Sequence, residues 1–269
     1  MATQVHSPAT GAQAPSLTAF IDKWIYVFMA AMLIAVVLVG FIPDSLGKIA
    51  AVRAGERPPF PIAMHVHAVL MGSWLLLLLA QTTLMATGRK QGHMQLGVTG
   101  MVLAPALVLA GVMLVPTNIR AFLDFSEGAP AEVQEQVQGF LRFMTDIALL
   151  QLRAGFCFLL FVYLALRARK SDSGFHKRMI ILATIVPMPA AFDRMPFLFH
   201  TLPESPTTTH LWPLLCVAPM FFWDLYRQRS IHRAYWVYAA VMIPTGILLN
   251  VVWGSEWWHS VAPPILYGG

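Results

Sequence analysis

The strongest constraint on this chain is an apolar run over residues 65–93, HVHAVLMGSWLLLLLAQTTLMATGRKQGH, with histidine at both ends and basic residues near only one. The run exceeds the roughly 20 residues that a helix needs to cross a bilayer. Read as a helix, it places a histidine, a tryptophan and a glutamine on one stripe. This stripe consists of His67, Met71, Trp74, Leu78 and Gln81. We expect it to face the interior of a helix bundle, away from lipid.

The composition extends this expectation to the whole chain. Hydrophobic residues make up 57% and charged residues 12% of the 269 residues, against roughly 25% charged residues in ordinary soluble domains. We therefore predict an all-α polytopic membrane bundle with seven transmembrane helices. The spans are expected near residues 24–43, 63–87, 94–116, 143–167, 177–199, 210–226 and 234–253, forming one domain over 24–253. A disordered N-terminal tail is expected over 1–23 and an outer C-terminal tail over 254–269.

Basic residues divide unevenly between the two ends of these predicted spans, and eleven of the 18 Lys and Arg fall at one end. By the positive-inside rule this end is cytoplasmic, which places the N-terminus inside the cell and the C-terminus outside. The net charge of +5 is therefore explained by loops that orient helices, and nucleic acid is not expected as a partner. The eleven are Lys23, Arg89, Lys90, Arg167, Arg169, Lys170, Lys177, Arg178, Arg227, Arg229 and Arg233.

Two further features concern the outer side. The segment that follows Pro130 keeps a helical apolar stripe, so we expect an amphipathic helix that lies on the surface or runs into the fourth span. Trp257 and Trp258 fall where an aromatic belt is expected.

Prolines interrupt the fifth and sixth spans and predict kinks, which often bound cavities. These are Pro187, Pro189, Pro196, Pro213 and Pro219.

The histidines are the candidate ligands for a haem or a metal ion. Two histidines from different helices can hold a b-type haem, and three can hold copper or zinc. The predicted topology places His65, His67, His200 and His210 at the outer end, and His93 and His176 at the cytoplasmic end. We expect His67 with His200 or His210 in an outer site, and His93 with His176 in an inner one. Trp74 could stack on a flat cofactor, although packing against other aromatic side chains is its more usual role.

Charges inside the spans are the sharper signal, because an ionised residue at mid-bilayer costs about 2.5–3.5 kcal/mol on insertion scales and usually has a partner. Asp146 and Arg153 share a face of the fourth span, and Asp193 and Arg194 lie near the outer end of the fifth. Two interpretations remain open. The charges form acid–base pairs that fix helix packing, or they line a polar pocket with the outer histidines.

Several segments resemble a known family. These are His67 through Trp74 and Gln81 to HMQLG at His93, HKRMIILAT at His176 with Arg194 downstream, and IHRAYW leading to WGSEWW. Together they resemble an uncharacterised family of seven-helix bacterial inner-membrane proteins, and the likeness implies the same location here. The chain is more loosely similar to b561-type cytochromes, whose histidines bind haem on both sides of the membrane, although the fourth span here has no histidine.

These observations support three functional hypotheses. The first is a membrane oxidoreductase or related protein that holds haem b or copper in a histidine-lined site. The second is a carrier, receptor or assembly factor for a small hydrophobic molecule, with the buried charges serving only helix packing. The third is an enzyme that acts on lipid or quinone. Nucleotide-driven work is not expected, since the chain has no Walker A loop and no GxGxxG motif.

Overall fold

The computed structural model describes residues 16–266, and all the regular secondary structure in that range is helical. Five stretches are long and apolar enough to cross a membrane: α1 (Leu17–Arg53), α2 (Ile62–Ala86), the stretch Lys90–Ser126, α5 (Ala131–Ala168) and α10 (Arg233–Val252). The third of these consists of α3 (Lys90–Val112) and α4 (Leu114–Ser126). The predicted all-α, membrane-type architecture is confirmed.

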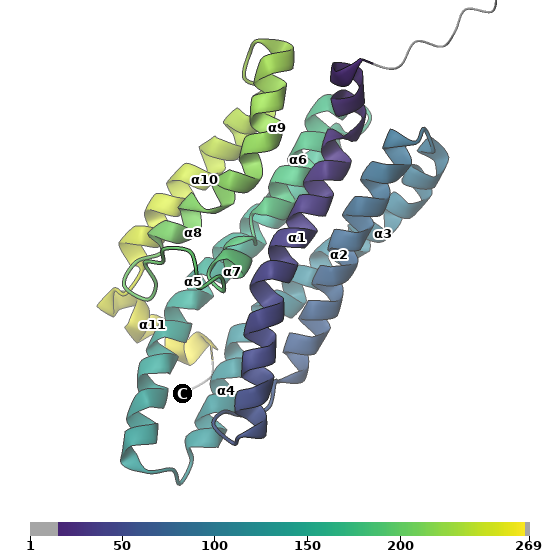
Figure 1. Cartoon of the computed structure of the whole chain (residues 1–269). Coiled ribbons are helices and arrows are strands. Elements are labelled where there is room, and N and C mark those ends of the chain that lie inside the picture. Colours follow the sequence, from purple (N-terminus) through teal and green to yellow (C-terminus); the bar gives the residue numbers. More distant parts are fainter. Residues whose placement is uncertain (1–15, 267–269) are drawn as a thin grey trace, which may run out of the picture.

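The basic residues gather at one end of the bundle. Figure 1 shows that the start of α1 and the α2–α3, α5–α6 and α9–α10 connections all lie at this end, which we call the basic end. Asp172 caps α6 (Ser173–Ile185) there and accepts a hydrogen bond from the Phe175 N–H at 2.8 Å. This bond lowers the pKa of the Asp172 carboxyl, and the nearby Arg233 lowers it further.

Two helices are much longer than a bilayer is thick. α1 has 37 residues and α5 has 38, so each is about 55 Å long, against roughly 30 Å for a hydrocarbon core. α1 begins at Leu17, well before the expected start of the first span. The predicted amphipathic segment after Pro130 runs into the fourth span as part of α5. Residues 1–15 of the predicted tail lie outside the described residues.

The predicted fifth and sixth spans are broken helices. α6 ends at Ile185, and after a turn at Pro187 the chain forms the short α7 (Pro189–Phe192). α8 (Thr207–Leu211) is followed at once by α9 (Pro213–Gln228). A proline has no N–H to donate, so each break leaves carbonyl groups without a helical partner. The predicted proline kinks at Pro187, Pro189 and Pro213 are therefore present as interruptions, whereas Pro219 lies inside the continuous helix α9.

The core lies where α1, α2, α5 and α6 meet. Trp74 and Leu78 from the α2 stripe are buried in it, as predicted. The ring of Trp74 packs edge-on against Phe158 of α5, with ring centroids 5.0 Å apart, and its N–H donates to Thr184 Oγ1 of α6 at 3.1 Å. α1 also touches the broken region, since a Cβ atom on Gly40 would lie 2.2 Å from the Ala191 carbonyl oxygen.

A smaller apolar cluster forms at the other end of the bundle. It joins α4, the first half of α5 and a C-terminal helix, α11 (Glu256–Leu266). Trp258 anchors α11, because its ring is buried and its N–H donates to the Thr145 carbonyl oxygen at 2.8 Å. Only Trp257 of the two tryptophans is exposed. The predicted outer tail is therefore helical where it is described, and Trp258 has a packing role.

Candidate functional site

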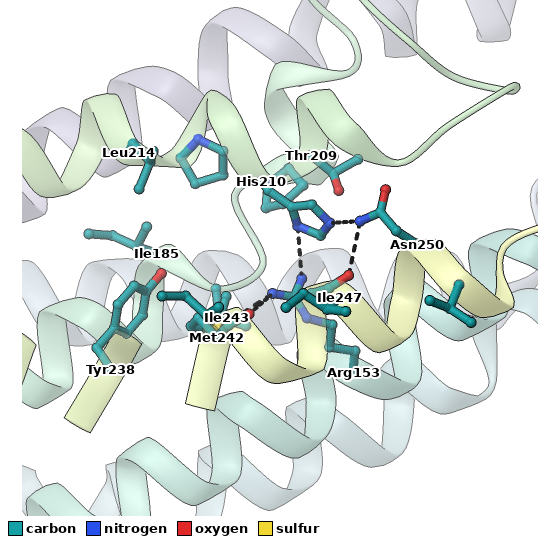
Figure 2. Close-up of a pocket in the computed structure, with 15 residues that line it drawn as sticks. Arg153, Ile185, Thr209, His210, Leu214, Tyr238, Met242, Ile243, Ile247 and Asn250 are labelled. Atoms are coloured by element: carbon teal, nitrogen blue, oxygen red, sulfur yellow. Dashed lines mark hydrogen bonds between the residues drawn. The ribbon is translucent and has the colours of Figure 1, made fainter. Parts of the chain in front are cut away.

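A cavity of about 530 Å³ lies among α5, α6, α8, α9 and α10. Most of its lining is apolar, with Ile185, Leu214 and Ile247 contributed by three different helices. Three polar side chains, Arg153, His210 and Asn250, point toward one another on one side, and the hydroxyl of Tyr238 lies apart from them (Figure 2). The cavity therefore has an apolar body and one polar wall.

Arg153 crosses from α5 to α10, and its partners are all neutral. Its Nε donates to Thr245 Oγ1 at 3.1 Å, and its Nη2 donates to the Met242 carbonyl oxygen at 3.2 Å. Its Nη1 lies 3.5 Å from Nδ1 of His210. Arg153 forms no salt bridge with any Asp or Glu among residues 16–266. Its positive charge is thus held by dipoles alone.

His210 on α8 lies between two N–H groups. One is the Arg153 guanidinium, and the other is the Asn250 amide, whose Nδ2 lies 2.8 Å from His210 Nε2. The same Nδ2 donates to the Gly246 carbonyl oxygen at 2.9 Å. A neutral imidazole has one N–H and one lone pair, so it accepts from only one of the two neighbours. The polar wall therefore has more donors than acceptors.

The cavity opens at the side of the bundle rather than at an end. Ile243, Ile247 and Val251 line it from α10, and Leu214 lines it from α9. All four side chains are also exposed on the outer surface. The opening therefore lies on an apolar outer surface formed by α9 and α10.

Both broken helices contribute to this cavity. Val186 and Pro189 line it beside the break between α6 and α7, while Thr209 and Pro213 line it beside the break between α8 and α9. Helices interrupted inside a membrane are tolerated where the freed backbone is buried in protein or faces a cavity. The prolines that predicted kinks thus mark the walls of the site.

Asp146 and Arg153 do not form an acid–base pair with each other. Although seven residues apart on α5, they bond to different groups. Asp146 Oδ1 accepts from the Gly254 N–H at 3.0 Å and lies 3.0 Å from Nε2 of His259. The carboxylate of Asp146 therefore fixes the turn between α10 and α11, and it leaves Arg153 without an acidic partner.

Arg194 forms its acid–base pair with Asp44 of another helix and not with the adjacent Asp193. Arg194 Nε donates to Asp44 Oδ2 of α1 at 3.1 Å, and Lys48 Nζ shares the same oxygen at 2.7 Å. Asp193 points elsewhere, and its Oδ1 is buried without a hydrogen-bond partner among the described residues. Neither residue lines the cavity.

The outer histidines do not converge on one point. His65 is exposed and His67 is half-buried against α3, where its ring lies 3.5 Å from the position of a Cβ on Gly111. His200 Nε2 donates to the Met195 carbonyl oxygen at 2.8 Å. Of the predicted outer set, only His210 lines the cavity. Among residues 16–266, no three His, Cys, Asp or Glu side chains are placed to hold a metal ion.

The predicted inner pair consists of His93 on α3 and His176 on α6. His176 directs its Nδ1 at the Ala165 carbonyl oxygen, to which it donates at 2.9 Å, so its Nε2 is the ring nitrogen left for a ligand. Trp74 and Gln81 lie apart from the cavity. Gln81 faces α3, with its Nε2 3.5 Å from the position of a Cβ on Gly97. Binding of haem or copper by these residues stays a prediction.

One buried charged cluster was not predicted. Arg178 of α6 donates from Nε to Asp224 Oδ2 at 2.7 Å and from Nη2 to Oδ1 at 2.5 Å. Tyr235 of α10 donates its hydroxyl to Asp224 Oδ2 at 2.5 Å. In the sequence, Arg178 counts among the basic residues at the cytoplasmic ends of the predicted spans, and no role is predicted for Asp224. The sequence signal for this pair was that Arg178 and Asp224 each lie just inside a predicted span.

Asn250 and Thr245 were also missed, because neutral polar residues in an apolar helix attract less attention than charges.

Comparisons with protein-family models, with curated proteins and with solved structures found no match.

Proposed function

We propose that this protein binds a small amphiphilic molecule from the membrane, as a carrier or receptor. The observation that carries the proposal is the lateral cavity, with apolar side chains around most of it and Arg153, His210 and Asn250 on one wall. Ligand sites in proteins are mostly apolar, with a few polar groups that fix orientation, and commonly have volumes of about 300–1,000 Å³. A cavity of about 530 Å³ lies within this range.

The position of the opening supports access from the bilayer. An amphiphile dissolved in one leaflet could slide its apolar chain between α9 and α10 while its polar head reaches Arg153. Its chain would replace lipid against Ile243, Ile247 and Val251. The charge of Arg153 would then contribute to binding. The carrier hypothesis, as stated from the sequence, gave the charges within the spans only a role in helix packing.

We also propose that the chain has seven spans, two of which are the broken helices α6–α7 and α8–α9. The basic end is cytoplasmic in this proposal, and the membrane is a bacterial inner membrane, as the family resemblance suggests. The concentration of Lys and Arg at one end supports the orientation. Reporter fusions test it: a cytoplasmic reporter should be active after Gly88 and inactive after Gly128, and the reverse would contradict it.

Mass spectrometry of the protein purified from its native membrane tests the binding proposal. We expect an amphiphile of a few hundred daltons to copurify in near-stoichiometric amount. Replacing Ile247 by Trp fills the cavity from α10 and should remove most of this molecule. Retention of a full complement by the Ile247→Trp variant would contradict the proposed site.

The neighbouring residue provides a matched control. Leu248 is 62% exposed and Ile247 is 61% exposed, but only Ile247 lines the cavity. Leu248→Trp therefore adds the same side chain to the same helix outside the site, and it should leave the bound amphiphile in place. Equal loss in both variants would indicate a general effect on α10.

A redox cofactor is the second candidate, and the bond from His176 Nδ1 to the Ala165 carbonyl oxygen favours it, because ligand histidines commonly donate their other ring N–H in this way. His176 and His93 would be the two axial ligands of a b-type haem, with quinone as its redox partner. An absorption spectrum of the protein from native membranes, oxidised and then reduced, tests this. A Soret band lost in His93→Ala would support it, and a featureless spectrum without stoichiometric iron or copper would refute it.

A further inference from the structure

We infer that the ligand of the Arg153 cavity carries a single carboxylate as its head group, so that the site selects long-chain carboxylic acids over neutral amphiphiles. This inference rests on the proposed function, since it specifies the chemistry of the molecule in the same cavity. Three observations support it: the charge of Arg153, the surplus of donors around it, and the apolar body of the cavity.

The first observation is an uncompensated charge. Arg153 is always ionised in proteins, and among the described residues its hydrogen-bond partners are a hydroxyl, a carbonyl oxygen, a thioether and an imidazole. Ionised residues in spans usually have a partner of opposite charge. Asp146, on the same face of α5, is already bonded to Gly254 and His259. A ligand with one negative charge would neutralise Arg153.

The second observation is the direction in which free donors point. Nε and Nη2 of Arg153 are directed at α10, where Thr245 and Met242 accept from them. Nη1 is directed toward His210, and its only neighbour there is a ring nitrogen at 3.5 Å. The Asn250 amide is directed at the same ring from the other side. The Asn250 amide already has two partners, His210 at 2.8 Å and the Gly246 carbonyl oxygen at 2.9 Å, so the weakly bonded donor is Arg153 Nη1. A carboxylate beside Nη1 would accept the N–H bond that the protein itself leaves weak.

The third observation limits the size and character of the rest of the ligand. The cavity has no second cation in its lining, so a doubly charged phosphate monoester would remain half-neutralised. Away from Arg153 the lining consists mainly of Ile, Val, Leu and Pro side chains. These suit an unbranched alkyl chain. A long-chain carboxylate, with one charge and one chain, fits each of these features.

Binding of two matched probes to the full chain in detergent tests the inference. Palmitate and hexadecanol have chains of equal length and differ in the head group. We expect palmitate to bind the wild-type protein at least tenfold more tightly than hexadecanol, measured by displacement of radiolabelled palmitate at a pH where the acid is ionised. Hexadecyl phosphate should bind more weakly than palmitate.

Arg153→Gln should remove the preference for palmitate and leave the affinity for hexadecanol within about threefold of wild type. Arg153→Lys, which keeps the charge, should retain part of the preference. Arg142→Gln is the matched control, since Arg142 lies on the same helix, is exposed and pairs with Glu256. Because Arg153→Gln loosens the contact with α10, Asn250→Leu provides a second test and should weaken palmitate at least threefold.

The results separate this inference from the proposed function. If hexadecanol binds the wild-type protein as tightly as palmitate, and Ile247→Trp blocks both, the cavity binds amphiphiles but the carboxylate inference is wrong. Tighter binding of hexadecyl phosphate would also overturn it in favour of a phosphate head. If neither probe binds and no amphiphile copurifies from native membranes, both the inference and the proposed function fail.

Discussion

Two arginines, one buried and one half-buried, show how differently one residue type is used in this bundle. Arg178 at the basic end is fully neutralised: its side chain is 9% exposed, its partner Asp224 is 7% exposed, and two parallel N–H bonds join them. Arg153, nearer the middle of α5, has neutral partners and faces a cavity. The protein itself supplies the carboxylate that neutralises Arg178. The charge of Arg153 is neutralised only if a ligand supplies a carboxylate.

The comparison distinguishes a packing charge from a binding charge without reference to any relative. A bidentate arginine–carboxylate pair has fixed geometry, so it positions α6 against α9 and, through Tyr235, against α10. A charge held by dipoles can exchange partners when an anion arrives. The difference predicts that the Arg178 pair dominates stability while Arg153 dominates binding.

The largest expected effect on stability is that of Asp224→Asn. The substitution keeps the shape of the side chain but leaves Arg178 buried without an anion, which typically costs about 3–5 kcal/mol. Thermal unfolding in detergent should show the loss as a fall in midpoint of roughly 10 °C. A midpoint within about 2 °C of wild type would mean that the pair does not hold the helices together.

Replacing both partners sharpens this result. The double substitution Arg178→Met with Asp224→Leu removes both charges together, and buried pairs replaced in this way often lose little or no stability. We expect the double variant to recover most of the midpoint lost in Asp224→Asn. Failure to recover would indicate that the hydrogen bonds to Gly174 and Tyr235, rather than charge balance, determine stability here.

Tyr235→Phe should have an intermediate effect. It removes one hydroxyl bond to Asp224 but leaves both arginine bonds, so we expect a loss of about 1.5 kcal/mol, in the range for hydrogen bonds to charged groups. The same unfolding assay measures it, with the exposed Tyr163 replaced by Phe as control. Equal losses of stability in Tyr235→Phe and Tyr163→Phe would show that the Tyr235 hydroxyl does not stabilise the Arg178–Asp224 pair.

The smallest expected effect on stability is that of Arg153→Met. Its acceptors keep their helical partners, since Thr245 Oγ1 also donates to the Val241 carbonyl oxygen at 2.7 Å, and the methionine chain fills similar space. We expect a loss of at most about 1 kcal/mol, the net value of an ordinary hydrogen bond. The single variant Arg178→Met should lose several times more, and similar losses would contradict the division between the two arginines.

The sequence predicted the architecture well because it depends on local signals. Apolar length and the stripe on residues 65–93 indicated helices that cross a membrane with Trp74 inward, and prolines marked the interrupted segments. In the structure, the predicted kinks beside α7 and α8 are breaks between helices. The short helices α7 and α8 could not be predicted, because each has too few residues to show a periodic pattern. The number of spans and their orientation stay predictions.

The site was predicted in part, and the reason lies in which residues carry a visible signal. Arg153 and His210 were identified because a charge or a histidine within a span is conspicuous. Their partners Thr245 and Asn250 are neutral and lie on a span without charges of its own. The partners of Asp146 and Arg194 were missed for another reason. These partners, His259 and Asp44, are more than 100 residues away in sequence. Such contacts depend on tertiary packing.

A map of the protein in a lipid nanodisc tests the central claim most directly. Electron cryomicroscopy with a bound antibody fragment would provide the size and alignment that a chain of 29.8 kDa lacks. The account predicts elongated density in the cavity between α9 and α10, with its polar end in contact with Arg153. A cavity closed by side chains, or Arg153 paired with a carboxylate of the protein, would contradict it.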